Sequence, residues 1–198
     1  MWVDNMVEPK PVLSFHVFLI ALLAFLTASV PAMSYEEPEY SIVKKTDVYE
    51  VRQYNKRTVA EVTYGEEDSG FRVLFDYISG ANKGSKEFAM TIPVTQSTTV
   101  GKMSMRFFLP IQYSKQNAPE PNDNRVRIID LPAEYFAVIS YSGFASYDNF
   151  EEHYNELKAA LDKDGMVIKG PPIKATYNSP FTLPFLRRNE AMYPVEWN

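Results

Sequence analysis

Two adjacent arginines near the end of the chain are the residues best suited to binding chemistry. Arg187 and Arg188 follow an apolar stretch in the segment LPFLRRNE, and Glu190 comes two residues later. Guanidinium groups beside an apolar wall suit a flat hydrophobic ligand that carries carboxylates, because arginine binds carboxylates with paired hydrogen bonds. Other interpretations stay open. The two arginines could instead hold the last strand in place. Glu190 could pair with one of them, or it could act as an acid or base in a pocket.

Histidine and cysteine usage narrows the chemistry further. The chain has two histidines and no cysteine, which excludes disulfides, thiolate metal sites and cysteine nucleophiles. His16 lies in an apolar N-terminal segment, which leaves His153 alone and excludes a multi-histidine metal site. His153 falls at the edge of an apolar helical stripe, either as a hydrogen-bonded structural residue or as a ligand to haem iron or another metal. No complete catalytic motif occurs, so we assign no catalytic and no metal residue.

A net charge of −5 and a pI near 5.2 give no basic stripe, and we therefore expect no nucleic-acid partner.

The segment from residue 70 to 82 carries the next candidate residues, on a predicted helix. Phe71, Leu74, Phe75 and Ile78 recur at the spacing of one helical face. This face has more large apolar side chains than a short helix needs for docking. The surplus predicts a surface for a flat apolar ligand, with Arg72 nearby to pair with its carboxylates.

The elements that must position these residues form a repeated order. A second helix is predicted over residues 146–165, and period-two alternation predicts strands in segments such as RTVAEVTY and EYFAVISY. The order of strands, helix, proline and final strand occurs once in 40–113 and again in 125–198, which indicates a duplicated ββαββ unit. We expect one α+β domain, a distorted antiparallel β-barrel of about eight strands with two helices outside. A ligand groove between the pseudo-twofold halves follows from this arrangement.

The N-terminal segment is predicted to direct export. Residues 12–32 are almost wholly apolar or small, which is typical of a signal peptide or of an N-terminal membrane anchor. The expected organisation is therefore residues 1–33 as a signal peptide or anchor, followed by a folded domain at 34–198. Either form would place that domain in the periplasm or outside the cell, and a retained anchor would tether it to a membrane.

Several motifs together resemble the SOUL haem-binding protein family. They are YEVRQY, LFDYISGANKGSKEFAMTIPVT, MRFFLP, APEPND and GPPIKATYNSPFTLPFLRRNE, and they run from about residue 40 to residue 197. The resemblance implies a distorted barrel of two pseudo-symmetric halves, similar to the effector-binding domains of certain bacterial regulators. It also implies non-covalent binding of haem or another tetrapyrrole, without a single agreed catalytic activity.

The resemblance implies a site on the first helix. Some relatives have a histidine, proposed as an axial ligand, where this chain has Gln53. In others haem is thought to lie on apolar residues that match Phe71 and Phe75, assisted by basic residues at positions that match Asp68 and Asp76 here. The arginine pair of the RRNE motif is retained.

We therefore expect an exported protein that binds haem by hydrophobic contact on the first helix. Its candidate binding residues are Phe71, Arg72, Phe75, Ile78, His153, Arg187 and Arg188. One alternative is a small-molecule hydrolase in which Glu190 works with Tyr64 or Tyr141. The other is a module that binds a cationic or lipophilic effector in the same groove.

Overall fold

The computed structural model describes residues 35–65, 70–99 and 101–197. The expected signal peptide or anchor at 1–33 lies outside these residues, and so does Asp68. Within the described ranges, no helix is both long enough and apolar enough to cross a membrane.

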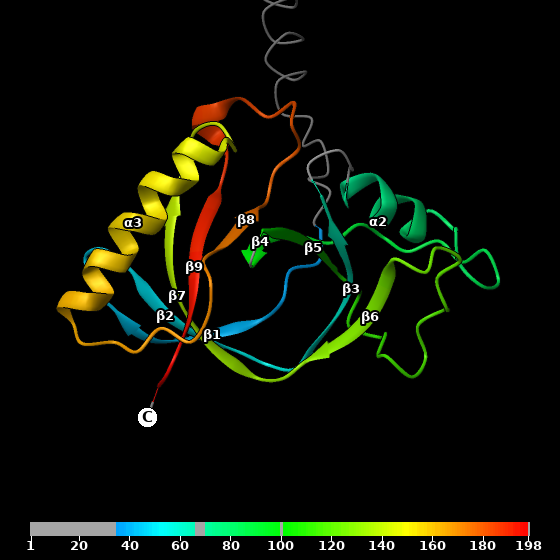
Figure 1. Cartoon of the computed structure of the whole chain (residues 1–198), viewed down its shortest axis with the longest axis horizontal. Helices are drawn as coiled ribbons and strands as arrows, with labels where there is room; N and C mark the ends of the chain where they lie inside the picture. The colour runs from blue at the N-terminus through cyan, green and yellow to red at the C-terminus, as the bar shows by residue number, and fades with distance from the viewer. Residues whose placement is uncertain (1–34, 66–69, 100, 198) are drawn as a thin grey trace, which may run out of the picture. The chain divides into compact units, whose positions relative to one another are not determined.

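Nine antiparallel strands form one curled sheet, with two α-helices on its outer, convex side (Figure 1). The helices are α2 (Gly70–Ile78) and α3 (Tyr147–Lys163). The strands are β1 (Tyr40–Lys45), β2 (Glu50–Tyr54), β3 (Arg57–Tyr64), β4 (Val94–Thr99), β5 (Lys102–Phe108), β6 (Val126–Leu131), β7 (Glu134–Tyr141), β8 (Ile173–Thr176) and β9 (Asn189–Val195). A short 3₁₀ helix, η1 (Pro184–Leu186), precedes β9. The α+β class and the curled sheet with two outer helices were both expected from the sequence. The ninth strand, β1, is an addition at one edge.

The strand order is symmetric about the centre of the sheet. It reads β1-β2-β7-β9-β8-β4-β5-β3-β6, so β4 and β8 meet in the middle, and β5-β3-β6 mirrors β9-β7-β2. In each half, the first strand of the ββαββ order pairs with the other half. β2 pairs with β7, and β6 pairs with β3. The linkers from β2 to β3 and from β6 to β7 therefore cross from one side of the curl to the other.

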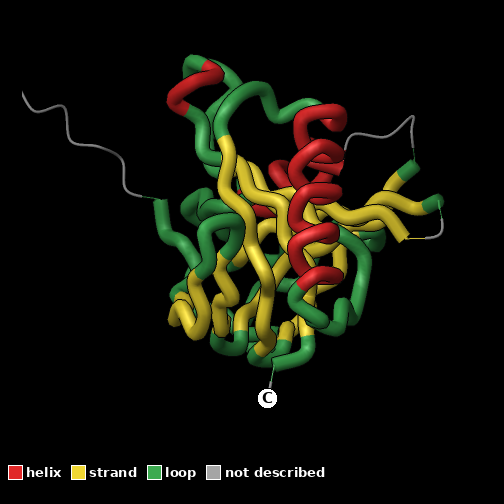
Figure 2. The backbone as a smooth tube through the Cα atoms, turned by 90° about the vertical axis from the view of Figure 1, so that its left-hand side faces the viewer, coloured by secondary structure: helices red, strands yellow, loops and turns green. Residues whose placement is uncertain are grey.

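Each helix covers one side of the convex face. Leu157 and Leu161 of α3 are fully buried against β7 and β9, and Figure 2 shows α3 lying along that side of the sheet. Ser146 caps α3, because its side chain accepts a hydrogen bond from the backbone N–H of Asn149. Leu74 and Tyr77 of α2 are buried against β3, β5 and β6. A third apolar cluster lies on the concave face, and this face therefore also has a packed core.

Candidate functional site

The exposed side of α2 carries a pair of aromatic rings. Phe71 and Phe75 are 44% and 47% exposed, although phenylalanine is normally buried in a folded domain. Their rings stack with centroids 5.9 Å apart and an interplanar angle of 12°. Phe71 also lies edge-on against Phe107 of β5, with centroids 5.2 Å apart. The two rings form a flat apolar surface that is anchored to the sheet.

Local packing fixes the position of this surface. Gly70 begins α2 directly on the ring of Tyr64, where an added Cβ would lie only 2.6 Å from a ring carbon. After α2 ends, the buried side chain of Asn82 donates hydrogen bonds to the carbonyls of Tyr77 (2.8 Å) and Lys86 (2.7 Å). Its amide oxygen accepts a third from the Lys86 N–H at 2.9 Å. Both ends of the helix are therefore held, which keeps its aromatic pair in place.

A pocket of about 360 Å³ lies beside Phe71, over the central strands β4 and β8. This volume falls in the lower part of the range for small-molecule sites. Apolar, amide and cationic side chains contribute to the wall. The lining residues are Phe71, Val94, Gln96, Met105, Ala145, Lys174, Thr176, Asn178, Pro180, Arg187 and Asn189.

Two cations in this pocket have no carboxylate partner among the described residues. The Lys174 Nζ donates a hydrogen bond of 2.5 Å to the carbonyl of Ala145, and burial lowers the pKa of Lys174 below its usual 10.5. Arg187 donates from Nε to the Thr182 carbonyl (2.7 Å) and from Nη2 to the Pro180 carbonyl (2.6 Å). The carbonyls orient both groups without neutralising their charge. The sequence interpretation missed Lys174.

The other residues proposed from the sequence lie elsewhere. Ile78 is 5% exposed and packs in the core beneath α2, whereas Arg72 lies on the exposed side of the helix. His153 of α3 stacks on Tyr141 with ring centroids 3.9 Å apart. Its Nδ1 is 2.6 Å from the carbonyl of Asn149. These contacts agree with the interpretation of His153 as a hydrogen-bonded structural residue. Ile78, Arg72 and His153 do not line the pocket.

The two arginines point to opposite faces of the sheet. Arg188 reaches the concave face, where it donates two hydrogen bonds to Glu37 (2.9 and 3.0 Å) and stacks over Tyr177 at 3.8 Å. Side chains alternate along extended backbone, so neighbours in a strand face opposite ways. Arg187 alone is left on the helix side, in the pocket.

Glu190 is fully buried on the concave face and already neutralised. It accepts hydrogen bonds from Arg52 at 3.0 Å, from Arg188 at 2.9 and 3.1 Å, from the Tyr177 hydroxyl at 2.6 Å and from Ser140 at 3.1 Å. The arginine partners fix it as a structural charge. Oε1 accepts from both arginines and Ser140, and Oε2 accepts from Tyr177, so the carboxylate is held within the core rather than aimed into the pocket beside α2.

The remaining positions complete this separation. Tyr64 and Tyr141 pack with the clusters beneath α2 and α3, across the sheet from Glu190, so neither tyrosine is placed to work with Glu190 as the hydrolase interpretation expected. Gln53 lies on β2, in the half of the sheet that α3 covers rather than beside α2. Asp76 is exposed on α2.

Comparison with known proteins gives a family and relatives. The model of the SOUL heme-binding protein family matches residues 35–194, which is nearly all of the described chain. Heme-binding protein 2 of Homo sapiens is 27% identical over 164 residues, covering 76% of this chain and 78% of that protein. Heme-binding protein 2 of Mus musculus is 26% identical over 179 residues, with 83% and 85% covered.

Solved structures resemble the fold at low sequence identity. The C-terminal domain of EcmrR superposes with a TM-score of 0.58 at 14% identity, covering 79% of this chain and 98% of that domain. A hydrolase from Listeria innocua superposes with a TM-score of 0.51 at 9% identity, covering 90% and 98%. At these identities the likeness establishes a shared architecture and nothing about chemistry.

Proposed function

This chain belongs to the SOUL heme-binding protein family, and we propose that it binds haem or a related tetrapyrrole without a covalent bond, in the pocket beside α2. The observation that carries this proposal is the pairing of an exposed aromatic surface with two cations that no carboxylate of the described residues neutralises. Phe71 and Phe75 offer the surface, and Lys174 and Arg187 offer the charges. A flat apolar macrocycle with two propionates has the matching chemistry.

The binding mode is hydrophobic contact with electrostatic orientation. The macrocycle packs over Phe71 and Phe75, and its propionates accept hydrogen bonds from Lys174 and Arg187. His153 packs on Tyr141 away from the pocket residues, and we propose that it supplies no axial ligand.

The contribution of Phe75 follows from its exposure. A phenylalanine side chain offers roughly 200 Å² of surface, of which roughly 90 Å² is uncovered here for a ligand to bury. At about 25 cal/mol per Å² this contact contributes about 2 kcal/mol, or roughly a 30-fold change in affinity.

The test is a hemin titration of the full-length protein, followed by absorbance in the Soret region. Phe75→Ala is expected to weaken binding roughly 30-fold, while His153→Ala leaves the Soret spectrum and the affinity unchanged. Ile111→Ala is the matched control for Phe75→Ala, because Ile111 is 82% exposed and lines a separate cavity on the concave side. The absence of a saturable Soret shift in the parent protein would refute haem binding. An equal loss in Ile111→Ala would refute the site.

The two cations are tested with charge-removing variants. Lys174→Gln and Arg187→Gln are each expected to weaken hemin binding, with Lys158→Gln as the control on the exposed side of α3. A hemin analogue with esterified propionates should bind the parent protein and both variants equally. If the esters discriminate among the variants as hemin does, then the propionates are not the groups that these cations recognise.

A cationic effector calls for a free acid in the groove, and Glu190 is held by two arginines. The hydrolase alternative requires Glu190 with Tyr64 or Tyr141, and both tyrosines lie on the other face of the sheet from Glu190. We therefore favour the tetrapyrrole-binding protein over a cation-binding module and over a hydrolase.

We further propose that residues 12–32 direct export of this domain. Expression in a bacterial host, followed by fractionation and mass measurement of the recovered protein, distinguishes cleavage after a small residue from a retained anchor. Recovery of the intact chain in the cytosol would refute export.

A further inference from the structure

One arginine on the concave face keeps two nitrogens without a hydrogen-bond partner among the described residues. Arg57, at the start of β3, has a side chain only 10% exposed. Its Nε and Nη2 are buried without a hydrogen-bond partner in the described part of the chain. The nearest carboxylate is Glu134, whose oxygen is 4.0 Å from Nη2, beyond hydrogen-bonding distance. A buried donor left unpaired costs free energy, so an arginine held this way calls for an explanation.

Aromatic rings surround this guanidinium and hold it in place. Its central carbon lies 4.6 Å from the ring centroid of Tyr54, 5.4 Å from that of Phe136 and 5.6 Å from that of Phe108. Ring faces attract a cation and offset part of its desolvation, but they accept no directional hydrogen bond equal to a carboxylate. Burial lowers the pKa of Arg57 from its usual value, yet arginine remains charged at neutral pH. The cage therefore encloses Nε and Nη2 and holds a fixed positive charge, and Nη1 is the nitrogen left for a ligand to reach.

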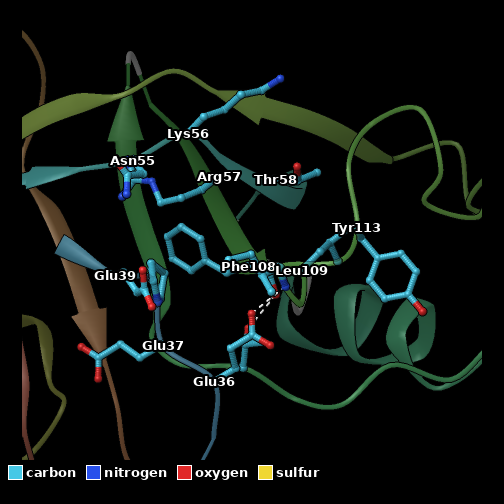
Figure 3. A pocket seen from close by; sticks show the side chains of 13 residues that line it. Glu36, Glu37, Glu39, Asn55, Lys56, Arg57, Thr58, Phe108, Leu109 and Tyr113 are labelled. Atoms are coloured by element: carbon cyan, nitrogen blue, oxygen red, sulfur yellow. Dashed lines mark hydrogen bonds between the residues drawn. The ribbon is translucent and has the colours of Figure 1, made fainter.

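Arg57 lines a cavity of about 210 Å³, roughly the liquid volume of seven water molecules. Figure 3 shows its side chain beside the ring of Phe108, with Leu109 on the same wall. Lys56 also lines the cavity, but its ammonium pairs with Asp130 at 3.0 Å. Arg57, next to an apolar wall, is the lining cation without a carboxylate at hydrogen-bonding distance among the described residues.

Acidic residues from the N-terminal side of β1 form the other wall, and two of them are engaged. Glu36 accepts a hydrogen bond of 2.6 Å from the backbone N–H of Ile111, and Glu37 is paired with Arg188. Glu39 is the third acid of this lining. These charges repel a multiply charged anion more strongly than a singly charged one. The favoured ligand thus has one carboxylate and an uncharged body.

We propose that this concave cavity binds a small organic monocarboxylate. The carboxylate accepts hydrogen bonds from the Arg57 guanidinium, and the apolar body packs against Phe108 and Leu109. The site lies across the sheet from the pocket beside α2, so it is separate from the tetrapyrrole site and does not depend on it. A cavity of this size admits a simple aromatic or aliphatic acid but excludes a macrocycle.

The test is calorimetric titration of the full-length protein with benzoate, acetate and inorganic phosphate. Benzoate is expected to bind saturably and more tightly than acetate, because only benzoate reaches the apolar wall, and phosphate is expected not to compete. Arg57→Lys keeps the charge but loses the planar donor group, and it should weaken benzoate binding at least tenfold. Arg187→Gln, which alters only the pocket beside α2, should leave benzoate binding unchanged.

Glu134→Gln is a second variant that tests the role of Arg57 without changing Arg57 itself. It removes the nearest competing carboxylate from an exposed position and should leave benzoate affinity equal or higher, even if Arg57→Lys folds poorly. No saturable benzoate binding in the parent protein would overturn the proposal, as would unchanged affinity in Arg57→Lys. Loss of binding in Glu134→Gln, or binding of phosphate in preference to benzoate, would overturn it as well.

Discussion

The buried charge cluster around Glu190 makes a sharp prediction about stability. Glu190→Gln keeps the side-chain shape but removes the negative charge between Arg52, which has a side chain 5% exposed, and Arg188. Removing one partner of a buried ion pair typically costs about 3–5 kcal/mol. The low end of about 3 kcal/mol applies here, because Arg52 keeps Glu50 and Arg188 keeps Glu37 as carboxylate partners. In a chain of this size that loss corresponds to roughly 6–12 °C in the midpoint of thermal unfolding. Urea denaturation and thermal melting, both followed by circular dichroism, measure it.

A graded pair of controls makes the result interpretable. Glu37→Gln removes the other carboxylate partner of Arg188. The Glu37 side chain is 29% exposed, so this change should cost about 1 kcal/mol or less. Glu156→Gln lies on the exposed side of α3 and should change stability by less than about 0.5 kcal/mol. If Glu190→Gln costs no more than Glu37→Gln, then the cluster is solvated. Glu190 would then not be a fixed structural charge and would be available to a cationic ligand.

Three further predictions concern pH and local structure. Burial lowers the pKa of Lys174, so its charge is lost at a lower pH than the charge of an exposed lysine. Hemin affinity should therefore fall as pH rises toward 10.5, and Lys174→Gln should show a flatter dependence of affinity on pH in Soret titrations. Burial raises the pKa of Tyr54 and Tyr77 to about 12, against about 10 in the unfolded chain. Because the unfolded chain loses these protons first, the free energy of unfolding should hold below about pH 10 and decline between about pH 10 and 12. Urea midpoints and tyrosinate absorbance measure the two effects. Asn82→Ala removes three buried hydrogen bonds behind α2 and should cost about 2–3 kcal/mol by urea denaturation, whereas a loss below 0.5 kcal/mol would mean that this loop does not hold the helix.

The helices and strands could be predicted from the sequence, because each depends on the spacing of apolar residues within its own segment. The apolar spacing of Phe71, Leu74, Phe75 and Ile78 predicted the first helix, which begins at Gly70 as expected. It ends at Ile78 rather than near residue 82, because Gly80 adopts a positive φ of 106° that a continuing helix does not permit. The fold class followed from the order of such elements.

The site was only partly predictable, since it depends on which side chains reach the same face. The sequence analysis placed Arg187 and Arg188 in one site, whereas the extended backbone turns them to opposite faces and puts Arg188 on the face of Glu190. Lys174 gave no local signal, because its role comes from β8 lying beside β4 at the centre of the sheet. The unpaired state of Arg57 was likewise invisible, as it depends on rings from β2, β5 and β7.

The exchange of first strands between the two halves makes each half incomplete by itself. A chain cut in the loop between β5 and β6 yields two fragments joined by three strand pairs, β2 with β7, β3 with β6 and β4 with β8. Each fragment would expose unpaired strand edges that only the other fragment matches in register. Co-expressed fragments 1–113 and 114–198 should therefore reassemble as a split protein, while either one alone aggregates. The same interlock makes this loop a natural place to insert a reporter domain, because the loop connects the halves without taking part in the exchange.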